Sequence, residues 1–106
     1  MPDTFAKILA AVQADDWQVS THALQRLAKR AILGSELADT IGTGEVVEEY
    51  PNYHAGPCVL VLQHDHQSPV HVLWGLATGT SAPAVIVTAY RPDPKHWEAD
   101  NRTRKP

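Results

Sequence analysis

The first part of the chain repeats apolar residues at the spacing of an α-helix. Phe5, Ile8, Leu9 and Val12 recur at positions i, i+3, i+4 and i+7, which places them on one side of a helix. The polar and bulky residues 15–17 are expected to end it. The pattern therefore predicts an amphipathic N-terminal helix that packs one side against a core.

Two further helices are expected before the pattern changes. The capping residues Ser20 and Thr21 predict the start of a second helix, which should stop near Gly34. Its apolar side should consist of four residues at helical spacing: Leu24, Leu27, Ala28 and Ala31. A short third helix should follow, capped by Ser35 and closed by Gly42.

From residue 45 onward the apolar runs have the length of strands. Four strands are expected, over residues 45–50, 58–62, 70–76 and 84–90. The first is rich in glutamate, which discourages pairing with another chain and is typical of an edge strand. The second is apolar throughout, which favours a central, buried position.

Helices followed by strands with short connections indicate an α+β fold. We expect two or three N-terminal helices followed by a roughly four-stranded, mostly antiparallel sheet. The length of 106 residues fits one domain, which we place at residues 1–98. Residues 99–106 are expected to form a flexible tail.

Composition narrows the classes of function. Cys58 is the single cysteine, so an internal disulfide and a cysteine-based zinc site are both excluded. A reducing compartment, the absence of a secretory signal and the absence of a long apolar stretch together predict a cytoplasmic protein. The net charge of −3 is unlike that of most nucleic-acid-binding proteins, although it permits a local basic groove.

The second predicted helix carries a stripe of basic residues. His22, Arg26 and Arg30 recur every four residues, with Lys29 beside them, on the side opposite Leu24. Arginine forks on phosphate oxygens and a histidine that moves a proton suit a phosphodiester. The alternative is the solvated side of an amphipathic helix.

A second histidine lies inside a predicted strand. His71 stands among apolar residues, where an ionisable group is expected to be hydrogen-bonded or used in function. Thr88 and Tyr90 share one side of the last strand and could flank it. Both interpretations, a structural histidine and a functional one, stay open.

A metal site is a minor alternative. His64, Asp65, His66 and His71 carry side chains that suit zinc, copper or nickel. A His-x-His spacing in a polar turn is common by chance, and no further ligand motif supports it. We therefore expect neither a metal nor another cofactor.

Five segments of the chain form an ordered series of motifs. The first is a helix motif with Thr21, His22, Ala23, Arg26, Leu27 and Arg30. The others are Gly44–Tyr50, Pro57–Leu62, Pro69–Val72, and the set Ile86, Thr88, Tyr90, Pro92, Asp93 and Trp97. This series resembles a bacterial family catalogued as domain of unknown function 4258. One departure is Ala31, where that family usually has glycine.

The resemblance implies a fold and a function. In layout the family is similar to the metal-independent ribonuclease toxins of the RelE and barnase-like kind, which sit beside an antitoxin protein. By that resemblance one site would contain six residues: His22, Arg26, Arg30, His71, Thr88 and Tyr90. The implied reaction is attack of an RNA 2′-hydroxyl on the adjacent phosphate, with histidines as base and acid and arginines that stabilise the phosphate charge. The alternative is a non-enzymatic protein-binding module that docks through the strand at residues 45–50 or through the sheet face.

Overall fold

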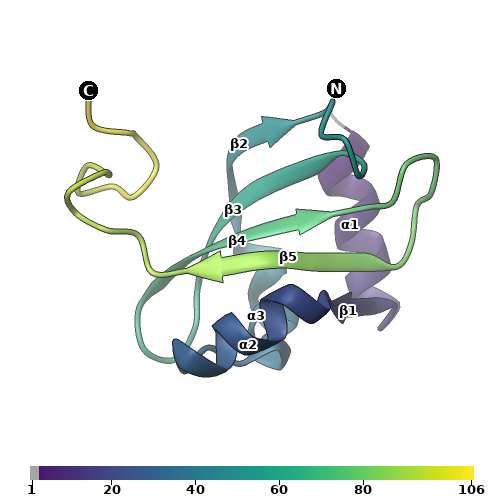
Figure 1. Ribbon diagram of the computed structural model, residues 1–106, viewed down its shortest axis with the longest axis horizontal. Coiled ribbons are helices and arrows are strands. Elements are labelled where there is room, and N and C mark those ends of the chain that lie inside the picture. The colour runs from purple at the N-terminus through teal and green to yellow at the C-terminus, as the bar shows by residue number, and fades with distance from the viewer. Residues whose placement is uncertain (1–2) are drawn as a thin grey trace.

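The structure is a computed structural model that describes residues 3–106 (Figure 1). Within that range the helices are α1 (Asp3–Gln13), α2 (Thr21–Lys29) and α3 (Gly34–Thr40), and a 3₁₀ turn, η1 (Ile41–Thr43), follows. The strands are β1 (Trp17–Val19), β2 (Glu45–Tyr50), β3 (Cys58–His64), β4 (Pro69–Gly75) and β5 (Ala84–Tyr90). The predicted α+β class is confirmed. No helix in this range is both long and apolar enough to cross a bilayer.

The strands form one mixed sheet in the order β1-β5-β4-β3-β2. Three neighbouring pairs are antiparallel, and β1 runs parallel to the first half of β5. The predicted β2 edge strand is confirmed, whereas β1 was not predicted. Three residues are too few to display the alternation of a strand, so the pairing of β1 is decided by tertiary structure.

Helix α2 begins as expected and ends earlier. The Ser20 hydroxyl accepts a hydrogen bond from the Ala23 amide at 3.1 Å, which confirms the predicted N-cap. The helix stops at Lys29 and not near Gly34. It ends because Ala31 adopts a φ of 56°, a left-handed conformation that turns the chain out of the helix.

The predicted apolar side of α2 is largely wrong. Leu27 is buried as expected, but Leu24 is 55% exposed, and Ala28 and Ala31 are exposed too. Ala23 is buried instead. The helix packs against β5, so only a narrow strip of it is covered.

The predicted cap of α3 is also wrong. The helix begins one residue before Ser35, and Leu33 occupies the N-cap position without a side-chain hydrogen bond. The turn η1 continues directly from α3 and leads into β2. Local capping chemistry therefore does not set the start of this helix.

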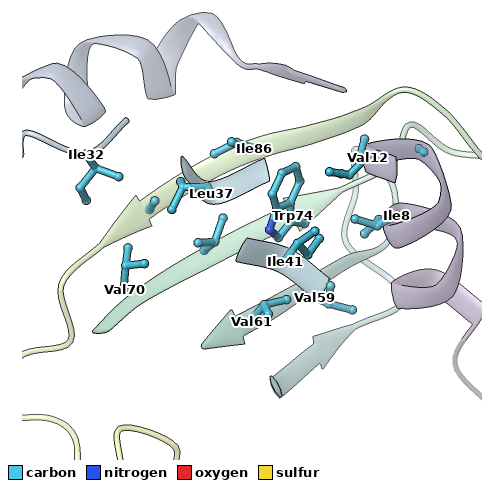
Figure 2. Packing of buried hydrophobic residues seen from close by; sticks show 14 of the residues in the cluster. Ile8, Val12, Ile32, Leu37, Ile41, Val59, Val61, Val70, Trp74 and Ile86 are labelled. Carbon is cyan, nitrogen blue, oxygen red and sulfur yellow. The ribbon is translucent and has the colours of Figure 1, made fainter. Parts of the chain in front are cut away.

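The hydrophobic core lies between one face of the sheet and the helices α1 and α3 (Figure 2). Ile8 from α1 and Leu37 from α3 pack with the strand residues Val59, Val72 and Ile86 and others. A polar link joins these layers. Buried Gln63 donates to the Leu37 carbonyl at 2.8 Å and accepts from the Trp74 indole at 2.7 Å.

The C-terminal residues, expected to form a flexible tail, instead fold into a compact loop beyond β5 (Figure 1). Trp97 and Arg104 form a bridge, and the Glu98 amide donates to the Thr103 carbonyl at 2.8 Å. Asp100 accepts hydrogen bonds from the amides of the two residues that follow Asn101. This loop contacts the face of the sheet opposite the core, as described below.

Candidate functional site

The face of the sheet opposite the core is the candidate functional surface, and we call it the open face. Residues directly opposite in an antiparallel pair project to the same side. The register therefore aligns rows of side chains on this face. One row is Glu45, Leu62, His71 and Tyr90, and the next is Glu48, Leu60, Leu73 and Thr88.

His71 lies at the centre of this surface and is fully buried. Its Nε2 donates to the Asn101 carbonyl oxygen at 2.7 Å, so the proton resides on Nε2. Its Nδ1 accepts from the Tyr90 hydroxyl at 3.4 Å. The Trp97 ring stands edge-on, with ring centroids 4.4 Å apart. Burial lowers the pKa of His71 below its ordinary value, which keeps the imidazole neutral.

A charged cluster borders the histidine on the β2 side. Arg104 donates to the Glu48 carboxylate from Nε at 2.6 Å and from Nη2 at 3.0 Å. Tyr50 also donates to Glu48, and the Arg104 guanidinium lies 4.6 Å above the Trp97 ring centre. The hydrogen bonds from Arg104 lower the pKa of Glu48, and the same pairing raises the pKa of Arg104.

A small aromatic cavity adjoins this cluster on the open face. Its volume is about 180 Å³, and its walls include Tyr50, Tyr53, Thr88 and Tyr90. Burial raises the pKa of Tyr90, so its hydroxyl stays protonated and able to donate. A second cavity of about 300 Å³ shares Tyr53 and extends along the same face. The open face is therefore hollowed and lined mostly by aromatic and aliphatic side chains.

The six residues expected to form one site are only partly brought together. His71, Thr88 and Tyr90 project from neighbouring strands onto the open face. Arg30 lies at β5, where its Nη1 donates to the Ala89 carbonyl at 2.7 Å. His22 and Arg26 are exposed on α2, and within residues 3–106 no hydrogen bond or ion pair joins either to His71.

The histidines considered for a metal are dispersed. His66 and Asp65 lie in the turn between β3 and β4, beside Glu36 of α3. Asp65 is bound by both Nη atoms of Arg91 at 2.9 and 2.7 Å, and turn amides donate to it as well. These bonds lower the pKa of Asp65 and occupy its oxygens. The group fits an ion pair that holds the turn better than a metal centre.

The sequence patterns did not predict the residues around His71 that come from β2 and from the C-terminal loop. The sequence places Glu48 only in an acidic edge strand, and it predicts a flexible tail that includes Asn101 and Arg104. It indicates Trp97 as part of a motif, without a contact partner. Its presence beyond β5 is the one signal that could have indicated a folded segment there, because an aromatic residue of this size is usually buried.

The fold and its open face define a small α+β domain whose sheet carries α1 and α3 on one side and α2 beside β5, with a buried histidine hydrogen-bonded to Tyr90 on the other side. The chain belongs to the family described as a domain of unknown function, DUF4258, whose model matches residues 19–91. That range contains the first four motif segments in full and the fifth as far as Tyr90. Comparison with curated proteins and with solved structures gave no significant match.

Proposed function

We propose that this protein is a metal-independent endoribonuclease of toxin type that binds single-stranded RNA on its open face and is neutralised by a partner protein. The observation that carries the proposal is the tyrosine-lined cavity whose wall includes Tyr90, the hydrogen-bond partner of His71. Typical ligand pockets measure roughly 300 to 1,000 Å³. A cavity of about 180 Å³ fits a single planar ring system, and tyrosines stack on unpaired bases.

The chemistry follows from the state of the side chains. Neutral His71 accepts the proton of the RNA 2′-hydroxyl while the 2′-oxygen bonds to phosphorus. The bond from phosphorus to the 5′-oxygen breaks, and that oxygen takes a proton from the second histidine, His22. The products are a 2′,3′-cyclic phosphate and a free 5′-hydroxyl. Arg26 of α2 and Arg30, the residue that caps the C-terminal end of this helix beside β5, hold the phosphate, while Thr88 and Tyr90 orient it.

The decisive experiment is RNA cleavage by the purified protein in excess EDTA. Wild type and His71→Gln are compared on single-stranded RNA, with and without ribosomes. Glutamine keeps a donor for the Asn101 carbonyl but cannot accept and release a proton near neutral pH. We expect a loss of at least about 100-fold in rate, the contribution typical of a general base.

A matched variant tests the role of helix α2. His22→Ala removes an exposed imidazole without opening a cavity, so the fold should be unaffected. Loss of cleavage in this variant would place His22 in the site as the acid. Unchanged cleavage would remove α2 from the mechanism while leaving His71 in place. Intact wild-type protein that cleaves neither free nor ribosome-bound RNA would end the ribonuclease proposal.

A protein-binding module is the second candidate, and one feature of the sheet favours it. The outer edge of β2 pairs with no strand among residues 3–106. Such an edge can accept an added strand from a partner protein. If this candidate is right, His71→Gln changes stability alone.

A further inference from the structure

The loop formed by residues 97–104, which we call the strap, covers the part of the open face that the proposed reaction needs. His71 is 0% exposed, and its Nε2 is already bonded to the Asn101 carbonyl oxygen at 2.7 Å. Trp97 lies against the imidazole and is itself 4% exposed. A phosphate group therefore has no path to this histidine while the strap is in place.

The backbone conformation and internal hydrogen bonds of the strap hold it in this position. Asn101 has a φ of 59°, a conformation that asparagine tolerates better than most residues, and its carbonyl accepts from the imidazole. Asp100 accepts three hydrogen bonds from the chain that follows it, two of them from backbone amides. The loop is thus ordered by its own contacts, and it meets the sheet as a preformed unit.

Three polar contacts fasten the strap to the sheet. Besides the bond to His71, Arg104 pairs with Glu48, and Arg102 pairs with Glu45 at 3.2 Å. Within residues 3–106, no strand ladder joins the strap to β2. Ion pairs between half-exposed side chains contribute little to stability. The strap is therefore held mainly by the burial of Trp97 and by the His71–Asn101 hydrogen bond, and the ion pairs add a smaller contribution that single substitutions can remove.

We infer that the strap is an autoinhibitory segment that occupies the place of the RNA phosphate over His71 and must swing away before the site can act. The inference rests on the proposed function for its biological meaning. The Asn101 carbonyl oxygen accepts the hydrogen bond from the His71 Nε2–H, as a phosphate oxygen would. Release of Arg104 from Glu48 opens the strap and exposes His71 and the Tyr90 hydroxyl together.

The test measures access to His71 directly and does not depend on any activity. The full-length protein is treated with diethyl pyrocarbonate, and modification of each histidine is followed by peptide mass spectrometry. Exposed His54 and His96 serve as internal references. Arg104→Ala removes the ion pair with Glu48 and the cation–π contact with Trp97. Arg102→Ala is the matched control, since it removes a cation of the same strap whose partner, Glu45, is exposed and does not bond Tyr50.

In wild type, His71 should react far more slowly than His54 and His96. Arg104→Ala should raise its modification rate by up to about fivefold, the shift in the equilibrium between closed and open states that loss of a strong surface ion pair produces. Arg102→Ala should change it by about twofold or less, and Glu48→Gln should reproduce the effect of Arg104→Ala from the other side of the pair. An unchanged modification rate of His71 in both Arg104→Ala and Glu48→Gln would contradict the inference that the strap opens when this ion pair is broken.

RNA cleavage by the same variants separates this inference from the proposed function. Faster cleavage by Arg104→Ala supports autoinhibition. Slower cleavage with an exposed His71 would overturn it, because Arg104 would then serve the reaction itself. Exposure of His71 without cleavage in any form would leave the covering strap supported and would end the ribonuclease proposal alone.

Discussion

Ala31→Gly should stabilise this protein, and the reason lies at the end of α2. The Ile32 amide donates to the Leu27 carbonyl at 3.0 Å, and the Ala31 amide donates to the Ala28 carbonyl at 3.2 Å. Together these bonds form a Schellman motif, in which Ala31 holds the position that requires a positive φ, here 56°. Leu27 and Ile32 also pack together in the core, so the motif is firmly held.

The magnitude follows from two opposing terms. A left-handed conformation costs an L-residue other than glycine about 1 to 2 kcal/mol. Glycine, in turn, loses about 0.5 to 1 kcal/mol more than alanine through backbone entropy on folding. Ala31 is exposed, so its methyl group contributes no core packing. The two ranges leave a net gain of about 0 to 1.5 kcal/mol, and its midpoint corresponds to roughly 3 to 6 °C in Tm for a chain of this size.

The measurement is urea unfolding followed by circular dichroism, with a thermal scan as a second readout. Ala28→Gly is the control, because Ala28 is also exposed but lies inside the helix, where glycine should cost about 1 kcal/mol. Equal destabilisation by both substitutions would refute the reasoning, since it would mean that residue 31 is not left-handed in solution.

Three further predictions follow from other buried positions. Burial lowers the pKa of His71, so the unfolded chain takes up its proton first, near pH 6.5. Stability should therefore fall as the pH drops below about 6.5, by at most about 1.4 kcal/mol per pH unit, and His71→Gln should lack this component when urea unfolding is repeated across pH. Gly56→Ala should cost about 3 kcal/mol or more, because its Cβ would lie 1.9 Å from the Leu76 carbonyl oxygen at a φ of 130°, whereas Gly79→Ala meets no atom within 4 Å and should cost about 1 kcal/mol. Gln63→Met should lose about 2 to 4 kcal/mol in the same assay, since it leaves two buried polar groups, the Trp74 indole and the Leu37 carbonyl, without partners; a loss below about 1 kcal/mol would show that this network is dispensable.

Sequence patterns predicted only those residues of the candidate site that lie on strands. The alternation along β5 placed Thr88 and Tyr90 on one side, and the strand position of His71 indicated an unusual environment. The helix stripe was less informative. Arg30 was expected to lie opposite the apolar side of α2, yet it turns toward β5 and binds a backbone carbonyl. A helix that covers a sheet edge buries a narrow strip, and hydrophobic periodicity does not locate such a strip when alanines make up much of the helix.

Local sequence patterns predict the α+β class, the strands from residue 45 to residue 90, the acidic edge strand and the cap of α2 at Ser20. These features depend on periodicity and capping, which act between residues close together in the chain. Tertiary contacts, by contrast, establish the pairing of β1 with β5, the buried Gln63 link and the folding of residues 97–104 over His71. Each of these joins segments distant in sequence, where the contact energy depends on three-dimensional proximity and leaves no local pattern to read.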